Sequence, residues 1–390
     1  MAEFTAVGDA IHNDFFVVTG SSFADDLQLL FETAVGTVTV APNVVRPQLA
    51  FVAQLPASVP TGRHWLRLRH GGTTTERIPV EVTAGPPYTV CVLYSGRPKP
   101  SPYTIVFVAN PAIESQAGDT FNADPVLTNR AGYHSAVAYC LQNILRETED
   151  LLRAGGTDAQ MRFVSVFDAT LAAQQENALA HEVSPNIMET PFNRLGVLAS
   201  FLTRFHEVAD VVFVLHGSTT HTRASAWFTR DDNSRPTVPF TYDGVARQHG
   251  RFSSIPGSCA IPVTEDTTAM TALHEFGHAA SDFNNGRVVD LYVNGTAGGF
   301  MANKKFRAQA TDPVPANFAT YNGTNYNSDP NRDALGYPAT WTSYHPQPID
   351  ATRPNLMDNF FLSFDTPLRC RLDQLTYAWM RDRLLAKLGR

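Results

Sequence analysis

The sequence predicts two folded parts: a small β-sandwich over residues 1–85, then a larger α/β (or α+β) domain with a mixed sheet over residues 86–390. Three observations support this division. A chain of 390 residues is too long for one small hydrophobic core. Short apolar segments separated by turns fill the first part, whereas later segments alternate between strand-like and helix-like patterns. The turn-forming run Gly85-Pro86-Pro87 marks the boundary.

The first part is expected to consist of short strands, several of which alternate apolar and polar residues. Strands at this spacing are typical of a β-sandwich. The expected strands are residues 15–18, 27–31, 37–40, 49–52, 64–68 and 78–82. Such a sandwich would be a spacer or a binding domain without catalytic groups.

In the second part, strand and helix patterns follow one another, which predicts a mixed sheet with helices packed on it. Tyr103–Val108 is an apolar run suited to a buried strand. Further strands are expected at residues 161–167 and 211–215, and helices at residues 130–153 and 192–208. Residues 286–354, rich in Asn, Gly, Pro and Tyr, are expected to form an irregular rim around a cleft. An amphipathic helix is expected over Leu372–Leu388.

Composition and charge argue against several classes of protein. Hydrophobic residues make up 43% and charged residues 17%, which describes a soluble globular chain and not a disordered one. The net charge of −7 and the lack of a polybasic run argue against a nucleic-acid partner. No apolar run approaches the ~18 residues of a membrane helix. The N-terminus lacks a signal-peptide pattern, so we expect export by a route without a visible signal peptide, and otherwise a cytoplasmic location.

The four cysteines, Cys91, Cys140, Cys259 and Cys370, lie far apart and form no CxxC pair. Their spacing indicates neither a zinc ribbon nor a particular disulfide. Disulfide pairing and redox compartment therefore stay open.

One short segment carries the strongest functional signal. In His274-Glu275-Phe276-Gly277-His278 (HEFGH), two histidines stand four residues apart, so on a helix both imidazoles can reach one metal ion. Glu275 would then lie beside that ion, where it can accept a proton from metal-activated water. The helix is expected to start near residues 264–268 and to bury an apolar stripe made of Met270, Leu273, Phe276 and Ala280. We therefore predict a site for one catalytic Zn²⁺ ion.

A catalytic zinc usually has three protein ligands, so the two histidines need a third. On a continuing helix Asp282 would lie ~12 Å along the axis from His274, too far for both to share an ion. We expect Asp282 to end the helix or to support a ligand. Asn284-Asn285-Gly286 should stop the helix, and the four residues from Gly286 to Asp290 can span up to ~13 Å. Asp290 is therefore the expected third ligand, and its alternative is a surface acid between apolar neighbours.

Taken in order, the motifs of residues 100–390 resemble the IgA-peptidase-type family of metzincin-like zinc metalloproteases. The resemblance rests on YTIVFVA, HEFGH, Asp290-Leu291-Tyr292, PANFATYNG…YPATWTSYHP, and PNLMDNF followed by Cys370. It implies that Met357 of PNLMDNF belongs to a methionine-containing turn that forms an apolar floor beneath the zinc. The family keeps its acidic ligand closer to the second histidine, in an Asp-Glu-Tyr run. Here the gap is longer, and Leu291 stands in place of the glutamate.

The first part has a resemblance of its own. VVTGSSF, LPASVPTGRHWLRLRHGG and IPVEV resemble an immunoglobulin-like module of the IPT/TIG type. An N-terminal β-sandwich is also usual in the metalloprotease family named above.

The expected activity is that of a zinc-dependent endopeptidase acting on a protein or peptide, with Glu275 as general base. Tyr292, Tyr344 and His345 are candidate hydrogen-bond donors to the oxyanion. One alternative is a binding or adhesion protein whose sandwich contacts a protein or a glycan and whose zinc domain is catalytically silent. Another is a zinc hydrolase acting on a non-peptide amide. The run at residues 216–221 suggests a Ser/His nucleophile, but it lacks a GxSxG elbow and reads more simply as the end of a strand.

Overall fold

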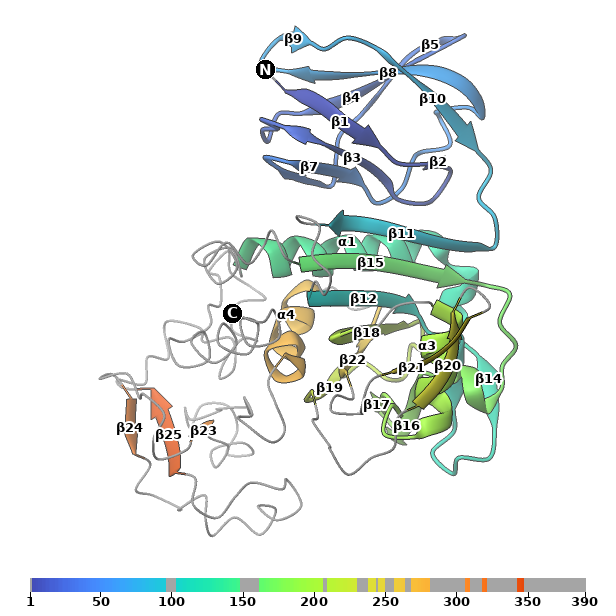
Figure 1. The fold of residues 1–390 in the computed structure, drawn as a ribbon, viewed down its shortest axis with the longest axis vertical. Coiled ribbons are helices and arrows are strands. Elements are labelled where there is room, and N and C mark those ends of the chain that lie inside the picture. Colours follow the sequence, from blue (N-terminus) through green and yellow to red (C-terminus); the bar gives the residue numbers. More distant parts are fainter. Residues whose placement is uncertain are drawn as a thin grey trace.

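The computed structural model describes residues 2–95, 103–147, 161–205, 209–229, 238–242, 245–249, 256–263 and 268–280, and three short strands between residues 306 and 346. Over these residues the protein is β-rich and multidomain, with several sheets and few helices (Figure 1). No helix among them is long and apolar enough to span a membrane.

The N-terminal part consists of two sheets packed face to face. The first sheet has the strand order β1 (Glu3–Val7), β3 (Phe16–Ser21), β7 (Leu49–Val52) and β6 (Val44–Arg46). The second sheet has the order β2 (Ala10–Ile11), β10 (Ile78–Thr83), β8 (Gly62–His70), β4 (Gln28–Thr33) and β5 (Gly36–Val40), and β9 (Thr73–Thr74) pairs with β8. Side chains of both sheets share one core, in which the ring centroids of Phe16 and Phe31 lie 5.4 Å apart. Each of the six predicted strands overlaps an observed strand, and the predicted sandwich is present.

The first sheet is covered on both of its faces. Phe16 and Val52 point into the sandwich core, whereas their neighbours Phe15 and Phe51 belong to a second core that includes residues of the α/β part. This explains why all four residues of β7 are buried and apolar, without the alternation of a half-exposed strand.

A mixed six-stranded sheet forms the centre of the α/β part. Its order is β11 (Tyr88–Ser95), β15 (Met161–Asp168), β12 (Tyr103–Ala109), β18 (Val211–His216), β22 (Gly257–Pro262) and β19 (Ser225–Trp227). The four inner strands are parallel, and the two edge strands β11 and β19 are antiparallel to their neighbours. Strands β12, β15 and β18 match the prediction, whereas β11, β19 and β22 were not predicted.

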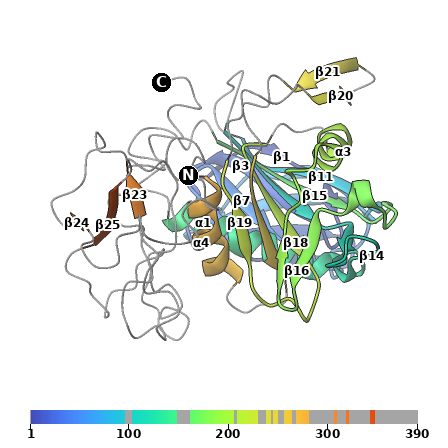
Figure 2. The same cartoon turned by 90° about the horizontal axis from the view of Figure 1, so that it is seen from below.

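The described α-helices lie on both faces of this sheet (Figures 1 and 2). Helices α1 (Arg130–Glu147) and α4 (Thr268–Ala279) share a core with one face, and α3 (Leu195–Phe205) packs on the opposite face. Alternate residues of β12 pack into the hydrophobic cores on the two faces of the sheet. Ile105 and Phe107 face α1 and α4, and Val106 and Val108 face α3. The parallel strands are therefore buried on both sides, as their apolar runs require.

Helix α3 begins later than residue 192, where the sequence predicted it. The carbonyl of Pro191 accepts a hydrogen bond from Arg194 N in a turn before the helix. The predicted continuation of α1 to residue 153 and the predicted helix Leu372–Leu388 lie outside the described residues.

Smaller elements complete the described chain. The short turns η1 (Pro125–Thr128) and η3 (Gln175–Asn177) accompany a four-stranded sheet of β14 (Phe121–Ala123), β13 (Ala112–Glu114), β16 (Ala180–Ser184) and β17 (Ile187–Glu189). A hairpin joins β20 (Val238–Tyr242) and β21 (Val245–His249). Within the stretch predicted as an irregular rim, the described residues form three strands of one antiparallel sheet: β23 (Phe306–Ala308), β24 (Phe318–Thr320) and β25 (Thr342–Pro346).

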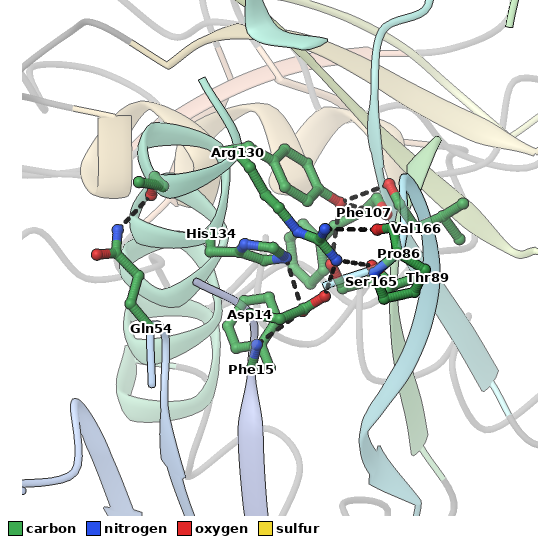
Figure 3. A network of polar contacts seen from close by, with 12 residues as sticks. Asp14, Phe15, Gln54, Pro86, Thr89, Phe107, Arg130, His134, Ser165 and Val166 are labelled. Atoms are coloured by element: carbon green, nitrogen blue, oxygen red, sulfur yellow. Dashed lines mark hydrogen bonds and ion pairs between the residues drawn. The ribbon is translucent and has the colours of Figure 1, made fainter. Parts of the chain in front are cut away.

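A buried polar network joins the sandwich to α1 (Figure 3). The carboxylate of Asp14, next to β3, pairs with the guanidinium of Arg130 and lies 2.9 Å from Nε2 of His134. Arg130 also donates to Pro86 O, on the segment that connects the two parts, and to Thr89 Oγ1 of β11. Gln54 Nε2 donates to Ala131 O at 2.6 Å. Polar contacts and the shared apolar core therefore hold α1 against the first sheet.

Candidate metal centre

Helix α4, which carries HEFGH, is buried along most of its length. Every residue from Thr271 to Ala280 is buried. Leu273 and Phe276 face the mixed sheet, where the ring of Phe276 stacks on that of Phe213 at a centroid distance of 6.3 Å. The predicted apolar stripe therefore fixes the rotation of the helix about its axis. The described helix begins at Thr268, within the predicted start region.

The last turn of α4 is anchored to the sheet. The carbonyl of Ala279 accepts hydrogen bonds from Thr229 N at 3.2 Å and from Thr229 Oγ1 at 2.9 Å, just after edge strand β19. Gly257, the first residue of β22, lies against the same carbonyl, and a Cβ atom at Gly257 would fall 1.9 Å from Ala279 O. Glycine is therefore required at position 257 for this close approach. Because His278 precedes Ala279, the same contacts fix the position of the second histidine.

The two histidines of HEFGH come together as the spacing predicted. Their Nε2 atoms lie 3.2 Å apart, their ring planes meet at 84°, and the exposed fractions are 3% for His274 and 8% for His278. The ring of Phe228 packs edge-on against His278 at a centroid distance of 6.0 Å. The pair is thus held in a mostly enclosed environment beside β19.

This spacing can be compared with that of two ligands on one ion. Two nitrogens bound tetrahedrally at the usual zinc distance lie about 3.3 Å apart, close to the observed 3.2 Å. A hydrogen bond between one protonated and one unprotonated ring nitrogen would have a similar length. The residues therefore fit a zinc ion, and a metal measurement separates the two arrangements.

Glu275 lies on the same turn and is 8% exposed. Its charge acts on Cys259 of β22, where burial, and to a smaller extent Glu275 and Cys140, raise the pKa of the thiol. Cys259 therefore stays protonated and chemically inert under the helix. Cys91, Cys140 and Cys259 are all free thiols.

The structure describes only some of the remaining predicted site residues. Asp282, Asp290, Tyr292 and Met357 lie outside the described residues. Tyr344 and His345 lie on β25, where Tyr344 is paired with Phe306 and Thr320 and His345 with Ala319. Over the described part of the chain, no three His, Cys, Asp or Glu side chains gather as a metal site. A third ligand at Asp290 therefore stays a prediction.

The end of β18 carries a second polar cluster. Ser218 Oγ lies 2.8 Å from His221 Nδ1, and His221 Nε2 lies 3.1 Å from Glu182 Oε1. The hydroxyl of Thr220 also approaches His221 Nδ1, at 3.0 Å. Sequence reasoning noted the serine and the histidine, but nothing in the sequence linked them to Glu182. Ser218 and His221 are only 8% and 6% exposed, so we interpret the cluster as a buried polar turn at the end of β18.

A buried carboxylate that the sequence reasoning missed lies nearby, where β12 and β18 end. Asp124 accepts hydrogen bonds from Gly217 N at 2.7 Å, Val126 N at 2.8 Å and Asn110 Nδ2 at 2.7 Å. Burial raises the pKa of Asp124, and these hydrogen bonds partly oppose that effect. Crevices at this position in α/β sheets often bind ligands, but here the network joins the ends of two strands. Its role is structural.

No protein-family model matches the chain, and no curated protein is significantly similar to it. The resemblance to metzincin-like peptidases therefore remains a prediction from motifs.

Proposed function

We propose that this protein is a zinc-dependent endopeptidase whose metal is held by His274, His278 and Asp290. The observation that supports the proposal most is the approach of two buried imidazole nitrogens to 3.2 Å on one helix. That distance suits two ligands of one tetrahedral ion. The glutamate that follows the first histidine adds the group that such hydrolysis requires.

Zinc, when bound, would supply Lewis-acid polarisation of a peptide carbonyl and lower the pKa of water toward neutrality. The chain's own groups would do the rest. Glu275 accepts the proton of the attacking water and passes it to the leaving amine. The anchored end of α4 keeps His278 in place through the Ala279 contacts. Tyr292, Tyr344 and His345 are candidate donors to the carbonyl oxygen, and Met357 is the proposed apolar floor.

The test compares three forms of the full chain in zinc content and in hydrolysis of casein and of a mixed peptide library. Glu275→Gln should retain zinc and lose at least about 100-fold in turnover, since a general base contributes about 10²–10⁴-fold. His274→Ala should lose both zinc and activity. Ser218→Ala should keep both, because the serine cluster lies outside the proposed centre. Undiminished turnover in Glu275→Gln would refute the assigned base.

The same measurements separate the alternative functions. A binding protein with a silent zinc domain would retain zinc in the unchanged chain and cleave no peptide of the library. A zinc hydrolase of another amide would leave peptides intact but cleave non-peptide amides in a Glu275-dependent way. Loss of hydrolysis in Ser218→Ala with zinc retained would move the chemistry to the serine cluster.

A further inference from the structure

The outward face of the second sheet carries an unusual set of side chains. Strand β8 alternates strictly, with His64, Leu66 and Leu68 buried. The residues between them point away from the sandwich core: Arg63, Trp65, Arg67 and Arg69. Trp65 is 42% exposed, although tryptophan is usually well buried. An exposed aromatic ring within a row of arginines offers a flat apolar surface with hydrogen-bond donors on both sides of it.

Neighbouring strands extend this face on both sides of Trp65. On β10, Pro79 stands opposite Trp65, and on β4, Glu32 does. The guanidinium carbon of Arg77 lies 5.0 Å from the centroid of the Trp65 ring. Trp65 and Pro79 thus form an apolar centre, and charged groups surround it.

Guanidinium groups outnumber carboxylates around this centre. Arg63 pairs with Glu81 at 3.4 Å, while Arg67 at 2.8 Å and Arg77 at 3.7 Å share Glu32. Arg69 donates to the neutral amide oxygen of Gln28 at 2.8 Å. Four cations therefore face two anions, although the whole chain has a net charge of −7.

These arginines can take further anionic partners at low cost. The side chains of Arg63 and Arg77 are 93% and 53% exposed, and ion pairs exposed to this degree contribute little free energy. Each guanidinium has five donors in a planar fork that matches a carboxylate or a sulfate group. The face also lies on the far side of the sandwich from α1, because the first sheet makes the contact with the α/β part (Figure 1).

We propose that this arginine face, defined by Arg63, Trp65, Arg67, Arg69 and Arg77, binds an anionic polysaccharide. The guanidinium groups bind carboxylate or sulfate groups on the chain, and the Trp65–Pro79 centre packs against a sugar ring. The apolar Trp65–Pro79 centre favours this ligand over duplex DNA, because a sugar ring can pack against it, whereas the bases of a duplex are stacked inside the helix and its outside is a phosphate backbone. The proposal is independent of the zinc centre.

The test uses the full chain and three resins: dextran sulfate, polygalacturonate and neutral dextran. The unchanged protein should be retained by at least one anionic resin, released by salt, and not retained by dextran. Comparison of the two anionic resins shows whether sulfate or carboxylate is the recognised group. Failure to bind either of them, or equal retention by dextran, overturns the proposal.

Substitutions separate binding by the arginine face from binding by arginines elsewhere on the protein. Combined Arg63→Gln, Arg67→Gln and Arg69→Gln should weaken binding at least about tenfold and flatten its salt dependence. Trp65→Ala should weaken binding while leaving the salt dependence unchanged, because ring packing releases no counterions. Arg223→Gln, at an exposed arginine of the α/β part, is the control and should bind normally. Unchanged binding by the triple variant, or equally tight binding of the unchanged protein to a DNA duplex, contradicts the proposal.

Discussion

Asp14 of the sandwich and His134 of α1 are joined by a contact of 2.9 Å between a carboxylate oxygen and a ring nitrogen, both almost fully buried. Burial raises the pKa of Asp14, but the hydrogen bonds from His134 and Thr89 and the charges of His134 and Arg130 outweigh it, and the pKa falls from 3.8 to about 2. The stability of the contact between the sandwich and α1 therefore depends on whether the Asp14 carboxylate is ionised.

The first prediction concerns Asp14→Asn. Because the folded-state pKa of Asp14 lies below its ordinary value, ionised Asp14 stabilises the fold above about pH 4, and the contribution is lost as pH falls toward 2. The substitution should reduce the free energy of unfolding at pH 7 by about 2 kcal/mol. Urea unfolding at several pH values measures it, and the difference from the unchanged protein should shrink as the solution is acidified.

Asp26→Asn is the matched control for Asp14. Asp26 also has a lowered pKa, chiefly through the backbone hydrogen bond from Gly71, but it is exposed on the sandwich. Its substitution should barely change the unfolding midpoint. A difference between Asp14→Asn and the unchanged protein that is the same at pH 7 and near pH 2 would contradict the role assigned to the Asp14 carboxylate.

The second prediction concerns Gly257→Ala. The added methyl group meets the carbonyl of Ala279 at 1.9 Å, so the end of α4 or the start of β22 must move. We expect a loss of about 1–3 kcal/mol in unfolding free energy, and weaker zinc retention because His278 lies next to Ala279. Thermal unfolding and metal content after dialysis measure the two effects.

Gly196→Ala, near the start of α3, tests whether any glycine substitution would do the same. A Cβ atom there meets no atom within 4 Å. Alanine favours a helix over glycine by about 0.5–1 kcal/mol, so this variant should be as stable as the unchanged protein or slightly more so. If Gly257→Ala behaves like Gly196→Ala, the close contact with Ala279 does not constrain the helix.

The third prediction ranks the two candidate acidic ligands. If Asp290 binds zinc, Asp290→Ala should weaken zinc affinity by more than about 100-fold, which exceeds the 10–100-fold effect of losing a group that only supports a ligand. Asp282→Ala should stay within that smaller range. Competition with a chelator of known affinity gives both values. The reverse order would make Asp282 the ligand.

The fourth prediction concerns the thiols. Burial is the largest cause of the raised pKa values of Cys91, Cys140 and Cys259. Little thiolate therefore forms near neutral pH, and these thiols should not react with DTNB in the folded protein. All four cysteines should react after unfolding in guanidinium chloride. Folded Cys370→Ser should show no reactive thiol, and a rapid reaction in that variant would place one of the other three at an accessible position.

Local patterns in the sequence predicted much of the fold. Alternation and apolar runs located strands such as β8 and β12, and helical spacing located α1 and α4. Strands β11, β19 and β22 of the mixed sheet escaped prediction. Strand β22 contains small residues such as Gly257 and Ala260, which give a weak hydrophobic signal. Strand β11 lies at the sheet edge, where Tyr88, Val90 and Val92 are partly exposed and blur the expected pattern.

The candidate site likewise has one part that the sequence predicted and another part that it could not predict. The four-residue separation of His274 and His278 was sufficient to predict that their imidazoles would meet, because one helical turn brings such residues together. The close approach of Gly257 to Ala279 could not be predicted, because it depends on how β22 and α4 pack. The link from His221 to Glu182 likewise joins residues of separate strands and loops.

The sequence by itself therefore determined the local elements and the pair of histidines, because strand alternation and helical spacing act over only a few residues. Tertiary structure alone decided that Asp14 meets His134, that β7 is buried on both faces, and that Gly257 fixes the end of α4. Contacts between distant residues follow from the packing of whole elements, which local patterns do not specify.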